Sequence, residues 1–369
     1  MRTEDMKPSN FYLITLIAIV VILVSACGST SSIAQAPATK APLPNALTSI
    51  KTNMPPHLDG SGDDLVWQIA PARVLDVTTS GIKPYQVTLK SAYDAGNIYI
   101  LVQYPDNSKE VMRAPWVFNS EKKTWERLDD GVGDEDEFGF YWNVNVPDYQ
   151  VEGCKGLCHD QDPNDKRMYT PKGTWVDIWT FNGARSAPMG WMRDMRQTDN
   201  PNASASGGFV EDEGSTTNPG YIDNLQTING MDLPMYWKPY SGVGGIITGD
   251  QIFLLQSEID AGFARKIVSE DANGNLVDED GNTVPYYARV PGRILSAPSG
   301  PSWNDIKAEG AWLNGVWTVE LSRKLNTGHS DDIQFDLNKD YYFDIYFKTR
   351  MPGEIDRQTL YVSKFSFAK

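Results

Sequence analysis

Residues 87–104, VTLKSAYDAGNIYILVQY, decide the fold class, because two strand-like runs flank a turn in this stretch. Apolar and polar residues alternate over residues 87–92, which is typical of a strand with one buried face. The second run, residues 98–104, follows the turn-forming pair Gly96-Asn97. The stretch therefore predicts a β-hairpin.

Strand-like runs of the same kind continue along the chain. They comprise residues 58–67, 138–146, 175–181, 252–259, 315–321, 341–349 and 360–367. No amphipathic helix of a dozen residues interrupts them, so the pattern predicts an all-β fold, a β-sandwich. Residues 147–174 and 182–245 lack any period and predict long irregular loops, which in a compact domain usually serve a function.

The N-terminal residues predict export and a lipid anchor. Arg2 and Lys7 precede an apolar stretch over residues 11–24, and the small residues Ser25 and Ala26 lead directly to Cys27. This is the pattern of a lipoprotein signal peptide, residues 1–27, whose cysteine carries the lipid. We expect an extracytoplasmic lipoprotein, membrane-anchored in the periplasm or at the cell surface. An uncleaved signal anchor with an incidental Cys27 is the alternative.

Composition then sets the domain boundary and limits the partners. Residues 28–56 are rich in Ser, Thr, Ala and Pro and predict a flexible linker, which leaves residues 57–369 as the folded domain. The net charge of -15 repels nucleic acid. We therefore expect a redox partner protein and contact with the membrane through the N-terminal lipid, and no nucleic acid.

Cys154-Lys155-Gly156-Leu157-Cys158-His159 is the sharpest motif, in a chain with only three histidines. Two cysteines followed by a histidine are what covalent haem attachment requires, but the usual motif has two residues between the cysteines and this chain has three. A small disulfide loop followed by a polar histidine is the alternative, and the spacing alone favours it slightly.

Two methionines are candidates for a second ligand, since haem iron accepts a thioether. Met168 lies nine residues after His159 and just before the strand predicted at 175–181, and Met112 begins the run MRAPW. We expect His159 with Met168 or Met112 to bind the iron. The alternative for each methionine is ordinary packing in a core.

The stretch between Asp271 and Asp280, within DANGNLVDEDGN, has the oxygen-rich alternation of calcium loops. It lacks the terminal Glu of the EF-hand, and the turns Asn273-Gly274 and Asp280-Gly281 explain it equally well as a hairpin insertion. Calcium is thus a second cofactor expectation. The chain has no phosphate-binding loop, nucleophile elbow or zinc-protease motif, which indicates a binding or electron-transfer protein and not an enzyme.

The order of these segments resembles the haem-binding domain of the ethylbenzene dehydrogenase γ-subunit type, over roughly residues 57 to 367. The matching pieces are residues 58–73, 87–106, 112–118, 134–144, 153–159, 167–170, 176–191 and 311–335. The resemblance implies a sandwich like that of carbohydrate-binding modules, with long loops around a haem at one end. It also implies a b-type haem with Met and Lys ligands, which passes electrons for a molybdoenzyme of the DMSO reductase type.

One departure from the family pattern concerns the ligands. Family members commonly have Trp-x-Trp-Lys where this chain has Trp179-Thr180-Phe181-Asn182, so that lysine is absent. The departure favours His159 with Met168 or Met112 and leaves c-type and b-type haem open. We expect a lipid-anchored cytochrome that serves such a molybdoenzyme or a surface electron-transfer chain. The alternative is a carbohydrate- or ligand-binding surface lipoprotein without haem, whose exposed tryptophans stack on sugars and whose Cys154 and Cys158 form a disulfide.

Overall fold

The computed structural model describes residues 46–77, 84–128, 135–159, 165–212, 219–239, 253–286, 288–348, 350–351, 354–355 and 361–369. The expected signal peptide with Cys27, and residues 28–45 of the expected linker, lie outside these ranges. Within them, no helix has the length and apolar character needed to cross a membrane.

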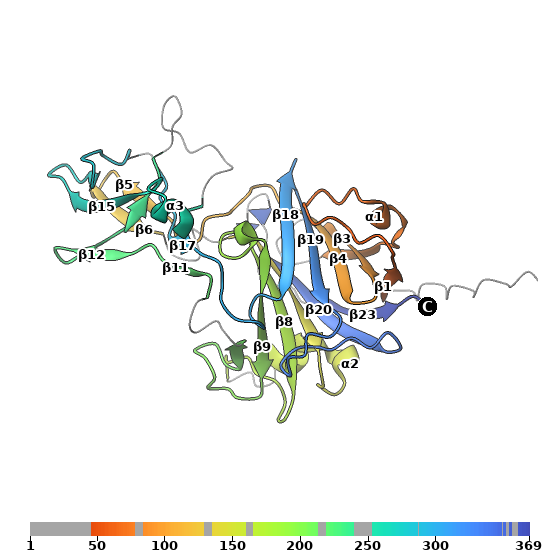
Figure 1. Ribbon diagram of the computed structural model, residues 1–369. Coiled ribbons are helices and arrows are strands. Elements are labelled where there is room, and N and C mark those ends of the chain that lie inside the picture. Colours follow the sequence, from red (N-terminus) through yellow and green to blue (C-terminus); the bar gives the residue numbers. More distant parts are fainter. Residues whose placement is uncertain are drawn as a thin grey trace, which may run out of the picture. The chain divides into compact units, whose positions relative to one another are not determined.

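A sheet of twelve strands forms the body of the protein (Figure 1). Its strands run in the order β1-β23-β20-β7-β8-β9-β18-β19-β4-β3-β2, and β10 pairs with β9. Because β1 also pairs with β3, it joins the two ends of the sheet. The strands are β1 (Ala46–Lys51), β2 (Arg73–Val77), β3 (Tyr85–Tyr93), β4 (Asn97–Pro105), β7 (Glu137–Asn143), β8 (Trp175–Asn182), β9 (Trp191–Thr198), β10 (Phe209–Glu211), β18 (Ile306–Leu313), β19 (Val316–Lys324), β20 (Asp340–Lys348) and β23 (Tyr361–Phe367).

Alternate side chains of these strands meet in an apolar core, which includes Phe140, Trp179, Val319 and Phe343. The side chains between them in sequence point to the other face of the sheet, because successive strand residues alternate. β3 and β4 form the hairpin predicted from residues 87–104, with Tyr93 opposite Ile98. The expectation of an all-β sandwich is therefore confirmed.

A second apolar cluster is built from two insertions that are distant in sequence, the first between β4 and β7 and the second between β10 and β18. Trp116 from the first insertion and Val290 from the second exchange both backbone hydrogen bonds, at 2.8 and 3.0 Å. Trp125, Trp237 and Ile267 pack in the same cluster. Figure 1 shows these elements grouped together. They are β5 (Trp116–Asn119), β6 (Thr124–Arg127), β11 (Tyr221–Asp223), β12 (Gln226–Ile228), β13 (Met231–Leu233), β14 (Tyr236–Trp237), α3 (Gln256–Asp260), β15 (Arg265–Glu270), β16 (Leu276–Asp278) and β17 (Arg293–Leu295).

The remaining elements are short. They are α1 (Leu65–Ile69), α2 (Tyr149–Cys154), the π-helical turn η1 (Lys155–His159), the 3-10 turn η2 (Ala187–Met189), β21 (Arg350–Met351) and β22 (Glu354–Ile355). The long loop expected at 147–174 therefore contains α2 and η1, which carry the two cysteines.

The structure corrects several expected boundaries. Residues 46–51, which were expected in the linker, are part of the sheet, because β1 pairs with β23 and β3 and buries Leu47 and Ser49. The loop expected at 182–245 contains β9, a central strand. The strand expected at 252–259 is α3, where the Glu258 carboxylate accepts a hydrogen bond from the Leu255 backbone N–H at 3.1 Å. The short strand expected at 58–67 gives way to α1.

Candidate functional site

A cavity of about 610 Å³ lies on the face of β7, β8 and β9 that points away from the apolar core. The alternation of the strands produces it. Phe140 and Trp179 belong to the core, whereas their neighbours Tyr141 and Ile178 line the cavity. The same strands thus support a packed core on one face and an open site on the other.

Two methionines line this cavity from different elements. Met168, which the sequence predicted as a ligand, is held by its backbone: its N–H donates to Ser206 O at 3.0 Å, and its carbonyl accepts from Gly208 N at 2.7 Å. Gly207 allows this approach, since it has φ +117 and a Cβ there would lie 2.4 Å from the Met168 carbonyl oxygen. Met195, on β9, is not among the ligands that the sequence predicts.

The cavity wall has an apolar part and a charged part. Tyr141, Ile178, Phe209 and Tyr346 supply the apolar surface. Tyr346 fits only because its neighbour on β7 is Gly139, where a Cβ would lie 2.4 Å from the tyrosine ring.

The charged part consists of two arginine–glutamate groups. Arg185 forms ion pairs with Glu135 and, at 3.3 Å, with Glu137, which also accepts a 2.6 Å hydrogen bond from the Tyr346 hydroxyl. Arg193 pairs with Glu211. The Nε of Arg193 is buried and has no hydrogen-bond partner, and the guanidinium carbon lies 5.3 Å from the centre of the Trp303 ring.

Cys154 and Cys158 are buried free thiols that lie beside the cavity without lining it. They pack in one cluster with Tyr141 and Ile178, and Met195 and Phe209 adjoin this cluster. Burial, together with a hydrogen bond to Cys158, raises the pKa of the Cys154 thiol well above its usual value.

Gln197 connects this cysteine loop to β9. The Cys154 Sγ lies 3.7 Å from Gln197 Oε1, and Gln197 Nε2 donates to the Cys158 carbonyl at 3.2 Å. The structure thus brings the cysteine pair and Met168 to the same face of the sheet. His159 ends η1, but its side chain is outside the described part of the chain.

Met112 lies elsewhere. It is buried, precedes β5 and is not among the residues that line the cavity. The next residue, Arg113, forms an ion pair with Glu135 at 3.3 Å. Glu135 also pairs with Arg185, which lines the cavity. Asn182, where the family pattern has lysine, is buried and donates to Glu137 Oε2 at 2.7 Å.

The segment between Asp271 and Asp280 forms two turns. The Asp271 carboxylate accepts from the backbone N–H groups of Asn273 and Asn275, at 2.8 and 2.9 Å. Asp278 repeats the arrangement with Asp280 and Asn282, at 3.0 and 2.8 Å. These hydrogen bonds account for the aspartates as turn residues of a hairpin insertion. Calcium at this segment stays a prediction.

A second cavity, of about 340 Å³, is lined by Trp175, Arg196, Asp199 and Asp331, among others. Nine of the eleven tryptophans, all of which lie in the described part of the chain, are buried. Only Trp175 and Trp312 are partly exposed. The expectation of many exposed tryptophans is therefore wrong, and Trp175 is the one that lines a cavity.

Comparison with solved structures gives remote likenesses. A family 9 carbohydrate-binding module from Caldicellulosiruptor kristjanssonii, in complex with glucose, has 8% identity and a TM-score of 0.31, covering 86% of this chain and 94% of that one. A protein from Bacteroides uniformis described as carbohydrate-binding has 8% identity and a TM-score of 0.36, covering 87% and 98%. Scores this low carry no argument about fold or ligand.

Comparison by sequence identifies the family. No curated protein matches the chain. A family model described as ethylbenzene dehydrogenase matches residues 63–345, which is well over half of the sequence and includes every strand of the main sheet except β1, β23 and the end of β20. The chain belongs to the ethylbenzene dehydrogenase family.

Proposed function

We propose that this chain is an extracytoplasmic, lipid-anchored haem protein that transfers electrons, and that it binds haem in the 610 Å³ cavity. The observation that carries the proposal is the meeting of two methionines, Met168 and Met195, in one cavity that is also lined by Arg185 and Arg193. Family membership supports a subunit related to a molybdoenzyme.

The residues of the cavity suit the parts of a haem. Its flat apolar ring requires surface of the kind that Tyr141, Ile178 and Phe209 offer. Its propionates require cations such as Arg185 and Arg193, which line the cavity. Its iron accepts thioethers, and Met168 and Met195 are the candidates. When bound, the group supplies one-electron redox chemistry, and the protein supplies ligands and a dry surrounding.

Non-covalent binding is favoured by the position of the cysteines. The Cys154 and Cys158 thiols pack beside Tyr141 and Ile178, and neither lines the cavity. We therefore propose a b-type haem and a packing role for the cysteines. His159 remains a proposed ligand from its sequence position alone, and Met195 replaces Met112 as the alternative to Met168.

The proposed setting follows from the sequence. The lipid on Cys27 would hold the domain at the membrane, and the net charge of -15 suits a basic or cationic redox partner. A molybdoenzyme of the DMSO reductase type or a surface electron-transfer chain is the proposed source or acceptor of electrons.

The test is the absorption spectrum of the full chain, expressed in a host with intact haem maturation. We expect a Soret band and reducible α and β bands, and extraction with acidified butanone should remove the haem. Met168→Leu and Met195→Leu should each change the spectrum and lower the midpoint potential, because a thioether ligand raises it. Met54→Leu, at a residue 63% exposed, is the matched control. A colourless protein would refute the proposal, and haem that resists extraction would show covalent attachment.

Carbohydrate binding is the second candidate, favoured by one observation. Trp175 lines the 340 Å³ cavity beside Asp199 and Asp331, which is the combination of an aromatic face and carboxylates that recognises sugar rings. Isothermal titration with glucose and cellotriose tests it. Binding that Trp175→Ala abolishes, in a protein without a haem spectrum, would favour this function over electron transfer.

A further inference from the structure

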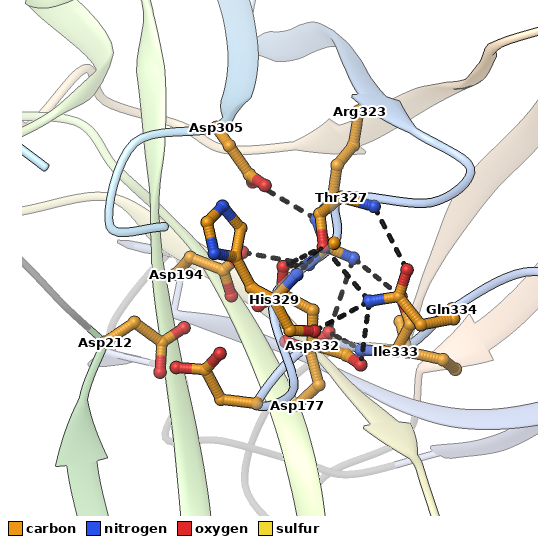
Figure 2. A network of polar contacts seen from close by, with 12 residues as sticks. Asp177, Asp194, Asp212, Asp305, Arg323, Thr327, His329, Asp332, Ile333 and Gln334 are labelled. Carbon is orange, nitrogen blue, oxygen red and sulfur yellow. Dashed lines mark hydrogen bonds and ion pairs between the residues drawn. The ribbon is translucent and has the colours of Figure 1, made fainter. Parts of the chain in front are cut away.

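A cluster of aspartates surrounds one buried arginine on the core-facing side of β8 and β9. Asp177 comes from β8, Asp194 from β9 and Asp332 from the segment after β19, and Arg323 lies near the end of β19 (Figure 2). Asp212 follows β10. All five side chains belong to residues at most 3% exposed. Burial of so many carboxylates is costly unless each is paired.

The cations of the cluster are too few for its carboxylates. Arg323 pairs with Asp177 at 3.5 Å, Asp194 at 3.3 Å, Asp332 at 2.7 Å and Asp305 at 3.2 Å. Arg196 pairs with Asp212 at 3.5 Å and Asp331 at 2.6 Å. Six carboxylates thus share two guanidinium groups, an excess of four negative charges if all are ionised.

The oxygens that Arg323 leaves free are the second observation. Arg323 contacts the Oδ2 atoms of Asp177, Asp194 and Asp332. The Oδ1 atoms of these three residues are buried and accept no hydrogen bond. The same is true of Asp212 Oδ2. Asp194 is fully buried, and neither of its oxygens accepts a hydrogen bond. Buried carboxylate oxygens without a donor are rare unless something else binds them.

The carboxylates also lie close enough together for a single ion. One oxygen from each of Asp177, Asp194 and Asp332 lies within 4.8 Å of the other two. A second set, Asp212, Asp331 and Asp332, meets the same limit and shares Asp332. Calcium binds oxygen ligands at about 2.3–2.6 Å, so two ligands of one ion lie at most about 5 Å apart.

We propose that Asp177, Asp194 and Asp332 bind a divalent cation, of which Ca²⁺ is the best match, with Asp212 and Asp331 beside it. Carboxylate-only donors and the absence of Cys or His from both sets favour Ca²⁺ over zinc. The ion supplies the charge that two arginines do not. It also ties β8, β9 and the segment after β19 together, independently of whether the cavity holds haem.

The carboxylates have one alternative to an ion, which is to keep protons. Burial and the neighbouring Asp177 raise the pKa of Asp194 well above its usual range, and burial raises the pKa of Asp212 to about 9. A cation and these protons compete for the same oxygens. Binding of Ca²⁺ at neutral pH should therefore release protons.

The experiment is calorimetric titration of the EDTA-treated full chain with CaCl₂ in two buffers of different ionisation enthalpy. We expect saturable binding, proton release and a raised melting temperature. Asp194→Asn should weaken binding at least ten-fold, since it removes a charged ligand. Asp271→Asn, in the hairpin insertion, is the matched control and should bind as the unmodified chain does.

A second measurement does not depend on the folding of a variant. Tb³⁺, a luminescent substitute for Ca²⁺, should be sensitised by Trp179, whose ring lies 4.8 Å from the Arg323 guanidinium carbon, and excess Ca²⁺ should quench the signal. The proposal is overturned if the unmodified chain binds neither ion. It is equally overturned if Asp271→Asn removes the binding and Asp194→Asn does not.

Discussion

The two faces of β8 and β9 carry opposite kinds of chemistry within one pair of strands. On the outer face, Ile178 and Met195 line a cavity with apolar and sulfur-containing side chains. On the inner face, the adjacent residues Asp177 and Asp194 are fully enclosed with Arg323. The outer face has a cavity, whereas the inner face is closely packed and has more carboxylates than arginines to pair with them. One backbone thus positions both sites.

The largest effect is expected from removing the inner cation. Arg323→Met would leave Asp177, Asp194 and Asp332 buried without their counterion, and breaking a buried ion pair costs about 3–5 kcal/mol. Urea unfolding in EDTA should show this loss. Arg167→Met, at an exposed pair with Asp165, is the control and should cost about 1 kcal/mol or less. A loss below 1 kcal/mol for Arg323→Met would mean that the aspartates are protonated and need no cation.

A smaller effect is expected from filling the outer face. Gly139→Ala places a Cβ 2.4 Å from the Tyr346 ring, and such overpacking costs about 1–3 kcal/mol. Because Tyr346 lines the cavity, we expect reduced haem content with unchanged Ca²⁺ affinity. Haem content by pyridine haemochrome and calorimetric titration check the two parts. Gly96→Ala, whose nearest neighbouring atom is 3.9 Å away, is the control. Loss of Ca²⁺ affinity in Gly139→Ala would show that the faces are coupled.

The sequence predicted the outer face better than the inner one. Met168 and the cysteine loop were singled out because thioether, thiol and imidazole groups are chemically distinct, and their part in haem binding stays a prediction. Met195 was missed because WMRDMRQT, with its two arginines, does not read as a strand, although β9 is paired on both sides by β8 and β18. Tertiary pairing overrode the local pattern there, as it often does in sheets.

The inner cluster could not be predicted, because its aspartates come from distant segments. Asp177, Asp194 and Asp332 are three of 48 acidic residues, and only the pairing of β8 with β9 and the return of the chain after β19 bring them together. The oxygen-rich run between Asp271 and Asp280 attracted the calcium expectation instead, since local spacing is visible in a sequence and spatial proximity is not. β1 was missed for a similar reason, because its partners lie at residues 85–93 and 361–367.

Lowering the pH should raise the free energy of unfolding through one carboxyl group on each face. Burial raises the pKa of Asp344, on the outer face beneath Cys154, and of Asp332, on the inner face, to about 6. The folded chain then holds protons that the unfolded chain, with carboxyl pKa values near 4, has already lost. Their contribution is complete below about pH 4 and is lost as the pH rises through about 6, at no more than about 1.4 kcal/mol per pH unit for each group.

Single variants separate the two contributions. The free energy of unfolding should fall between pH 4 and 6.5, and Asp344→Asn should reduce this fall by the contribution of the outer-face carboxyl group. Asp332→Asn, measured in EDTA, should reduce it by the contribution of the inner-face carboxyl group. Urea unfolding at half-unit pH intervals measures both. With Ca²⁺ present, the Asp332 share should disappear, because the ion stabilises the ionised form. A slope that neither variant changes would mean that these carboxyls ionise normally in the folded chain.

The smallest effect is expected at Met112, and it tests where the outer-face site ends. Met112 is 7% exposed and does not line the cavity, so Met112→Leu, which conserves volume, should cost less than about 1.5 kcal/mol. The haem spectrum should be unchanged, whereas Met168→Leu should alter it. A spectral change in Met112→Leu, with none in Met168→Leu, would place the iron near the segment before β5 and not beside Met168.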